Sequence, residues 1–193
     1  NFLTVITQSS AEAAIAIGSV STLTAGNLYS ISSLSDLNKL ASLVNSGQAS
    51  NCTFILTGDI DMANSPGYIP IGTDEHKFMG TFYGNGHVIS NVSISQSGTS
   101  GVGIFGVTGN TARILDLGVE NATVSGKDYT GVIVGNSAGT ITNCYVKGNV
   151  NVNGNSYVGA ITGQATNTIA SSYTSGNINI NGSGYVGGLA GYI

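Results

Sequence analysis

Charged side chains are scarce in this sequence of 193 residues. Asp, Glu, Lys and Arg together make up 7% of it, against about 25% in an ordinary soluble domain. Only five residues are basic and the net charge is −4, so the chain cannot form the basic stripe that phosphate contacts require. An anionic membrane surface is a poor partner for the same reason. The composition therefore excludes nucleic-acid binding, and we expect no nucleic-acid partner.

Tryptophan is absent, proline occurs only twice, and long apolar runs are missing. The apolar-leaning stretch 11–20 contains Glu12 and is too short to cross a bilayer, so we expect no transmembrane segment. The sequence begins at Asn and shows no basic leader, which we interpret as a start set either by processing or by the choice of the expressed segment. In place of charge stand 29 glycines and many Ser, Thr and Asn residues. These residues favour turns and polar ladders over helices, so the composition predicts β structure with many tight turns.

A step of 28 residues separates three boxes of the form Gly-x-x-x-Gly, which begin at Gly131, Gly159 and Gly187. A shorter version begins at Gly103, another 28 residues earlier. Aromatic and aliphatic positions share the period: Tyr129, Tyr157, Tyr185, Val124, Val152 and Ile180. One such unit cannot bury its own apolar side, so neighbouring units must stack. We predict an all-β parallel β-solenoid with coils of about 28 residues, spaced about 4.8 Å apart.

A second element recurs within the repeat and begins with an isoleucine, at Ile89, Ile114, Ile141 and Ile169. These segments are short, β-branched and bounded by Gly or Asn, as strands are. We predict that the four isoleucines form one buried column. Two positions after each of them stands a polar residue that we expect at a turn, where side chains bond along the stack: Asn91, Asp116, Asn143 and Ser171.

The N-terminal third differs from the repeats. Apolar residues at helical spacing between Leu34 and Val44 predict a helix, with Ser33 and Asp36 as a capping box. We interpret this helix as a cap over one open end of the solenoid, followed by a strand over 53–57 that opens the first coil. The predicted division is an N-terminal strand-forming arm (1–26), a cap helix with the opening coil (27–87), and the β-solenoid repeats (88–193).

These residues resemble the GLUG-motif repeat family of microbial surface proteins. The Gly-Leu-x-Gly box of that family is matched by residues 188–191, and its upstream segment by 56–61, 69–72 and 78–91. The resemblance covers roughly residues 31–193. Tyr83 departs from the family pattern, which commonly has Asp before the Gly-Asn-Gly-His turn. The resemblance implies a right-handed parallel β-helix in a secreted, adhesin-like cell-surface protein.

Motifs that could carry chemistry are few. Residues 101–106 match the Gly-x-Gly-x-x-Gly dinucleotide pattern as a string, but Val-Thr-Gly-Asn follows instead of a helix pattern, so we expect no cofactor. Asp59 and Asp61 alternate on an expected strand and are weak candidates for a calcium site. Hydrogen bonding to local amides is the alternative for them, and we expect no metal. We interpret the two histidines, His76 and His87, as turn or surface residues.

Many enzymes that act on polysaccharides use paired acidic groups, and this leaves an enzymatic alternative open. In the regular coils Asp116 and Arg113 could face each other, but a salt bridge explains them equally well. We therefore predict a non-enzymatic protein without catalytic residues. Cys52 and Cys144 lie about three coils apart, hence about 14 Å, which is beyond the reach of a disulfide. Cys144 replaces an apolar column residue, so we predict a buried free thiol there.

The two ends of the chain suggest self-association. A strand-compatible arm at one end and an uncapped repeat at the other predict head-to-tail assembly into a homopolymer, in which the arm adds a strand to a neighbour. The residues expected to carry this assembly are Phe2, Val5, Ile15, Ile17, Leu189 and Tyr192. We predict an extracellular structural protein, a subunit of a fimbrium- or pilus-like surface filament. The alternative is an adhesin module, with the arm folded back, that binds a host or environmental glycan or a receptor protein.

Two further polar features belong to the surface. The Asn-rich rows 149–153 and 177–181 are candidates for carbohydrate contact or lateral packing, whereas Glu120 interrupts the flat array that ice binding would need. Four Asn-x-Ser/Thr sequons are candidates for N-linked glycosylation, at Asn51, Asn91, Asn121 and Asn181.

Overall fold

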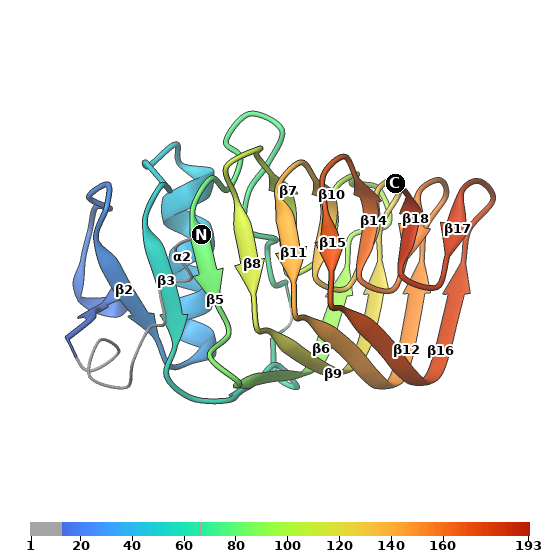
Figure 1. Ribbon diagram of the computed structural model, residues 1–193, viewed down its shortest axis with the longest axis horizontal. Helices are drawn as coiled ribbons and strands as arrows, with labels where there is room; N and C mark the ends of the chain where they lie inside the picture. Colours follow the sequence, from blue (N-terminus) through green and yellow to red (C-terminus); the bar gives the residue numbers. More distant parts are fainter. Residues whose placement is uncertain (1–12, 66) are drawn as a thin grey trace.

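The computed structural model describes residues 13–65 and 67–193. In these ranges the chain winds into a parallel β-solenoid of about six turns (Figure 1), which confirms the predicted fold class. Its strands form sheets of seven, five, four and two strands. No helix in the same ranges is long and apolar enough to cross a membrane.

The seven-stranded sheet runs along the whole stack. Its strands, in order, are β1 (Ile15–Ala16), β2 (Leu28–Ile31), β3 (Thr53–Leu56), β5 (Thr81–Tyr83), β8 (Arg113–Leu115), β11 (Thr140–Thr142) and β15 (Ile169–Ala170). One column is in register through all seven: Ile15, Tyr29, Phe54, Phe82, Ile114, Ile141 and Ile169. The predicted stacking of the last three isoleucines is thus confirmed.

The five-stranded sheet corrects one register prediction. It contains β4 (Ile60–Asp61), β6 (Val88–Ser95), β9 (Gly118–Ser125), β12 (Tyr145–Asn153) and β16 (Tyr173–Asn181). Ile89 pairs here with Ile60 and Val119, so its predicted column with Ile114 is wrong. Only a four-residue turn, 84–87, separates β5 from β6, and these strands therefore form successive sides of one coil, with Phe82 taking the place assigned to Ile89. Likewise Asn91 lies in the row of Asn121, not in that of Asp116.

The glycine boxes mark close approaches between backbones. They border the four-stranded sheet of β7 (Phe105–Thr108), β10 (Val134–Ser137), β14 (Thr162–Ala165) and β18 (Ala190–Tyr192), and the pair β13 (Val158–Gly159) and β17 (Val186–Gly187). A Cβ added at Gly135 would lie 2.4 Å from the backbone nitrogen of Val102, and one at Gly163 2.4 Å from that of Thr130. Real side chains do not approach backbone atoms so closely, so these positions require glycine.

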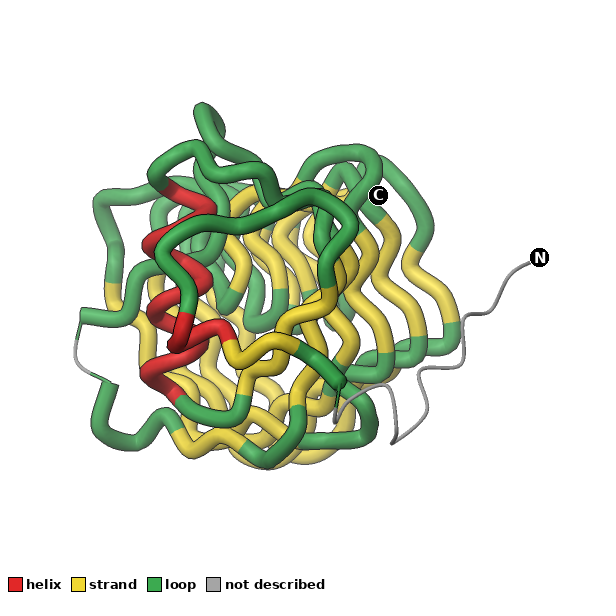
Figure 2. The backbone as a smooth tube through the Cα atoms, turned by 90° about the vertical axis from the view of Figure 1, so that its left-hand side faces the viewer, coloured by secondary structure: helices red, strands yellow, loops and turns green. Residues whose placement is uncertain are grey.

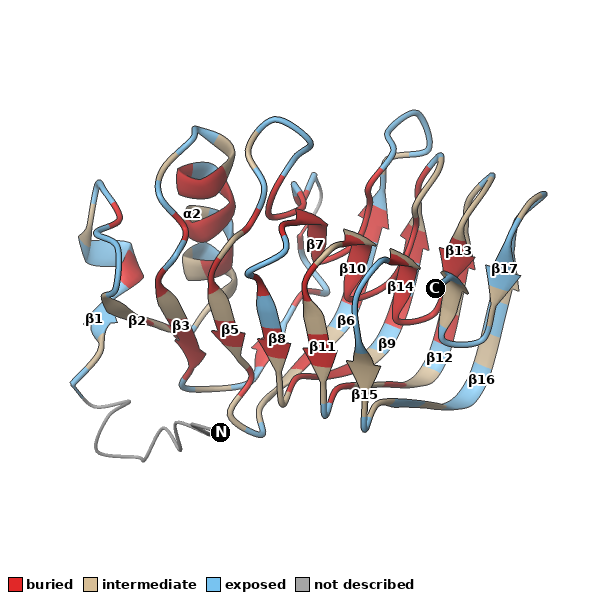
Figure 3. Cartoon of the chain, turned by 45° about the horizontal axis from the view of Figure 1, so that its top comes forward, coloured by how far each residue is buried: buried red, intermediate tan, exposed pale blue. Residues whose placement is uncertain are grey.

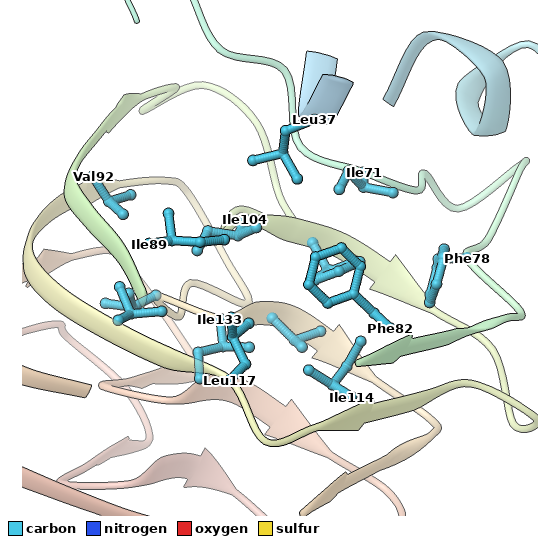
Figure 4. Close-up of a cluster of buried hydrophobic side chains, with 14 of the residues drawn as sticks. Leu37, Ile71, Phe78, Phe82, Ile89, Val92, Ile104, Ile114, Leu117 and Ile133 are labelled. Carbon is cyan, nitrogen blue, oxygen red and sulfur yellow. The ribbon is translucent and has the colours of Figure 1, made fainter. Parts of the chain in front are cut away.

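Apolar residues of the sheets form the buried core of the coils, and Figure 3 shows buried segments on the strands of successive coils. Aromatic rings form a run at the N-terminal half, with centroid separations of 5.8 Å for Tyr29–Phe54, 5.7 Å for Phe54–Phe78 and 5.1 Å for Phe78–Phe105. Figure 4 shows the surrounding cluster of buried hydrophobic side chains, which includes Phe82 and Ile114 of the seven-stranded sheet and Leu37 of the N-terminal helix. Side chains from separate coils therefore share one continuous core.

The predicted cap helix is α2 (Leu34–Asn45), at the N-terminal end of the stack (Figure 2). Ser33 is its N-cap, and its hydroxyl accepts a hydrogen bond from the backbone nitrogen of Asp36 at 3.2 Å. The Asp36 carboxylate does not return this bond to Ser33 as a full capping box would. It accepts instead from the backbone nitrogen of Ser32 at 2.9 Å and from the Ser32 hydroxyl at 3.0 Å.

The coil stack begins within the range expected to form an arm. Strand β1 pairs in parallel with β2 of the same chain, and the short 3₁₀ helix that follows it, Ile17–Ser19, packs against α2. Ile17 is completely buried in the core. Residues 15–19 therefore contribute to the first coil of their own solenoid.

Candidate functional site

Polar side chains at the corners of the coils bond to one another along the stack. The Asp128 carboxylate accepts from Asn155 Nδ2 and from the backbone nitrogen of Ser156, both at 3.1 Å. Asp116 accepts from Asn143 Nδ2, which confirms that this predicted pair lies at a turn. Such ladders satisfy polar groups between neighbouring coils and help to fix their register.

The weak calcium candidates, Asp59 and Asp61, belong to the same kind of ladder. Asp59 Oδ1 lies 3.0 Å from both His87 Nδ1 and the backbone nitrogen of Val88, and these contacts, the backbone bond first, lower the pKa of Asp59. Asp61 Oδ1 accepts from Asn91 Nδ2 at 3.0 Å, the main cause of its lowered pKa. In residues 13–65 and 67–193 no three His, Cys, Asp or Glu side chains are grouped so that they could hold a metal.

The remaining motifs with possible chemistry also have structural roles. Residues 101–106 lead into strand β7 and not into a helix, so they lack the helix N-terminus that a dinucleotide pyrophosphate needs. Ring nitrogen Nδ1 of His76 lies 2.9 Å from the backbone oxygen of Asn45, where it ties the loop after β4 to the end of α2.

The proposed Arg113–Asp116 salt bridge does not form in the described part of the chain. Arg113 is exposed on β8, and Asp116 contacts Asn143 and the Tyr83 hydroxyl instead. Burial and the nearby Asp116 raise the pKa of Tyr83. An ion pair does form between Lys147 Nζ and Glu120 Oε1, which lie 2.9 Å apart on neighbouring strands of the five-stranded sheet.

Both cysteines are buried free thiols, which confirms the prediction for Cys144. Burial raises the pKa of Cys144 to about 12 and also raises the pKa of Cys52. A thiol that stays protonated at neutral pH is a poor nucleophile and a poor metal ligand. Neither cysteine therefore forms a reactive centre.

A tyrosine ladder is the feature that sequence reasoning missed. The rings of Tyr129 and Tyr157 stack at 4.8 Å, and those of Tyr157 and Tyr185 at 4.9 Å. Tyr129 and Tyr157 adopt φ of 56° and 59°, a left-handed conformation that costs a bulky residue energy and that stacking helps to offset. The 28-residue spacing of these tyrosines was the available signal. Because the rings cover one another, the inner faces are closed to a sugar.

The residues predicted to carry assembly lie in three different settings. Phe2 and Val5 lie outside the described residues. Ile15 is 40% exposed on β1, whereas Ile17 is buried in its own core. Leu189 and Tyr192 are exposed on the last coil, whose other exposed apolar residues are Tyr185, Val186 and Ile193.

The Asn-rich rows stack in register as predicted, with each residue of 149–153 opposite one of 177–181. Asn179 Nδ2 donates to Asn151 Oδ1 at 3.3 Å, and Asn181 Nδ2 to Asn153 Oδ1 at 3.0 Å. The outer side of β12 and β16 thus carries hydrogen-bonded pairs of asparagine amides. All four sequon asparagines are exposed.

Known proteins resemble this chain in sequence and in fold. No protein-family model matches it. It is 38% identical over 138 residues to halomucin of Haloquadratum walsbyi, a stretch that covers 66% of this chain and 2% of halomucin. It is 32% identical over 102 residues to a provisionally named Gly-rich membrane protein of Evansella cellulosilytica, covering 49% of this chain and 12% of that protein.

Among solved structures, the chain is similar to a provisionally named immunoglobulin A1 protease from Bacteroides ovatus. The TM-score is 0.59 at 21% identity, and the match covers 86% of this chain and 62% of that one. At this identity the likeness shows a shared fold. The chain spans only a small part of the two curated relatives, since the matches cover 2% of one and 12% of the other.

Proposed function

We propose that this chain is a non-catalytic structural segment of an extracellular surface protein. The observation that carries the proposal is the continuous coil stack, with apolar columns inside and polar ladders at its corners. The relatives support an envelope location, because one is named a mucin and the other a membrane protein. Membership of the GLUG-motif family is part of this proposal and is supported by the box at 188–191.

The polar groups support a structural role over a catalytic one. A hydrolase of polysaccharides needs two carboxyl groups that face the substrate in one cleft. Three surface grooves of the described residues are lined by neither Asp nor Glu. His87 and Asp59 are close enough to form an acid–base pair, but Asp59 is held by the backbone of Val88, as a ladder residue would be.

A substrate panel tests the non-catalytic assignment. The purified chain is incubated with soluble acidic and neutral polysaccharides and with immunoglobulin A, and the products are followed by reducing-end assay and by gel electrophoresis. We expect no turnover. Cleavage of either class of substrate that is lost in the variant His87→Ala but kept in His76→Ala would contradict the proposal in favour of an enzyme.

Filament formation is the finer form of the proposal. It is supported by the seven-stranded sheet, in which β1 and β15 are the outermost strands among the described residues. The same column ends at Ile15 on one edge and at Ile169 on the other, so β15 of one copy could pair with β1 of the next. The exposed apolar residues of the last coil, among them Val186 and Leu189, would be covered by such a contact.

Electron microscopy at several protein concentrations tests this assembly. Fibres should form with the unaltered chain and should be lost in Val186→Asp, while Thr123→Asp on the exposed side of β9 serves as the control. Deleting residues 1–26 would also remove buried Ile17, so a deletion of 1–12 tests Phe2 and Val5 separately. Separate short particles at every concentration would contradict filament assembly.

An adhesin module is the second candidate, and the bonded row of amides on β12 and β16 favours it. Fixed amide donors and acceptors at strand spacing suit the hydroxyl groups of an extended glycan. A glycan array with the unaltered chain and with Asn151→Ala tests this candidate. Binding that the variant loses would support it, and the absence of any binding would leave only the structural role.

A further inference from the structure

The four sequon asparagines differ in what their side chains bind. Three of them are bonded to a neighbouring coil: Asn91 to Asp61, Asn121 to the backbone nitrogen of Asn149, and Asn181 to Asn153. Two of the three, Asn91 and Asn121, also lie within strands at φ of 53° and 57°. These amides already serve the ladders that join the coils.

Asn51 differs in all of these respects. It is exposed in the loop before β3, and no described residue hydrogen-bonds its side chain. Its backbone oxygen accepts from the nitrogen of Gly26 at 3.1 Å, and Thr53 donates its backbone N–H to Asn27 at 3.0 Å. The loop is therefore anchored through its backbone while the amide of Asn51 stays accessible.

A surface groove of about 430 Å³ lies beside Asn51. Its lining combines the apolar stem of Met79 with polar side chains of Gln48, Lys77 and Thr111. The Gln48 side-chain oxygen accepts from Leu23, so its NH₂ group remains free to donate. Apolar surface beside a few fixed polar groups is the lining that suits a sugar ring, which has both C–H faces and hydroxyl groups.

We propose that Asn51 is the acceptor of an N-linked glycan and that the first sugar of this glycan lies in the groove beside Met79. In the transfer, Asn51 Nδ2 bonds to the anomeric carbon of a lipid-linked oligosaccharide, supplied by an oligosaccharyltransferase. The bond from that carbon to the lipid phosphate oxygen breaks, the polyprenyl phosphate leaves, and an amide proton passes to a base of the transferase. The proposal rests on the extracellular location in the proposed function, because the chain must leave the cytoplasm to meet the transferase.

Mass spectrometry of the four sequon peptides, from protein purified out of its own source organism, tests the acceptor. We expect carbohydrate on the Asn51 peptide and a loss of that mass in Asn51→Gln, whereas Asn181→Gln keeps it. An unmodified Asn51 peptide from protein that is shown to be at the cell surface would overturn this inference and leave the proposed function standing. Absence of the protein from the surface would contradict the proposed function itself.

Lysine acylation tests where the glycan lies. Lys77 lines the groove, and Lys127 is exposed on a distant coil. A sugar seated in the groove should slow the acylation of Lys77 several-fold relative to the enzymatically deglycosylated protein, with no change at Lys127. Equal rates at Lys77 in the two forms would overturn the placement of the sugar.

Discussion

Thr130 is fully buried, and its hydroxyl oxygen has no hydrogen-bond partner in the described structure. Its bridge partners on the two neighbouring coils are Val102 and Val158. The Val158 methyl group Cγ2 already fits against Gly154, and the Thr130 hydroxyl fits against the same glycine. Replacing Thr130 by Val would put a methyl group in place of this hydroxyl, beside a glycine that already accommodates the methyl group of Val158. An unpartnered buried hydroxyl costs about 1–3 kcal/mol, so we expect Thr130→Val to raise the free energy of unfolding by about 1–2 kcal/mol.

Equilibrium denaturation with urea, followed by circular dichroism, measures this gain, and thermal scans at one fixed rate should show a higher midpoint. The matched control is Thr162→Val, because Thr162 is equally buried but its hydroxyl donates to the backbone oxygen of Gln164 at 2.8 Å. Thr162→Val should lower the free energy of unfolding by about 1 kcal/mol. If both variants lose stability to the same extent, the hydroxyl of Thr130 has a partner and the reasoning is refuted.

Three further predictions concern the boxes, the ladders and the thiols. Gly163→Ala should lower the free energy of unfolding by at least about 2 kcal/mol, because the added Cβ would collide with backbone atoms. Gly98→Ala, which has open space around it, should change the free energy of unfolding by no more than about 0.5 kcal/mol. Equal urea midpoints for the two variants would contradict the close approach at Gly163. The pKa values of Asp59 and Asp61 in the folded chain are lowered from 3.8. Their contribution to the free energy of unfolding is therefore complete above pH 3.8 and is lost as the pH falls through the lowered pKa values of the folded chain. Thermal midpoints between pH 5 and pH 2 should therefore fall less in Asp61→Asn than in the unaltered chain, and parallel curves would refute this. Cys144 should resist a thiol reagent at pH 8 until the chain unfolds, since its pKa is about 12; rapid labelling of the native protein would show an open core.

The period of 28 residues was sufficient to predict the fold, because parallel stacking converts a sequence period directly into spatial columns. Register was predictable only where the period was strict. Between residues 84 and 115 the length of the coils varies, and there Ile89 was assigned to the wrong column. The turn at 84–87 is too short to be recognised from the sequence as a corner between two sides of one coil. The number of residues between two strands does not by itself show whether they lie on the same side of successive coils or on two sides of one coil.

The surface features were less predictable from the sequence than the core. The position of Asn91 in a strand with positive φ depends on the pairing of β6 with β9, which the sequence does not encode locally. For Asp59 and Asp61 the sequence favoured hydrogen bonding to local amides over a metal site, but it could not name their partners, because these depend on which amide lies opposite each of them. The distinction among the four sequons likewise depends on the neighbouring coil and needs the three-dimensional structure.

Immunogold electron microscopy of intact cells of the source organism tests the central claim most directly. The antibodies are raised against the folded coil stack and applied before and after permeabilisation. An extracellular structural segment predicts gold particles on the outside of unpermeabilised cells. Label that appears only after permeabilisation would contradict the account.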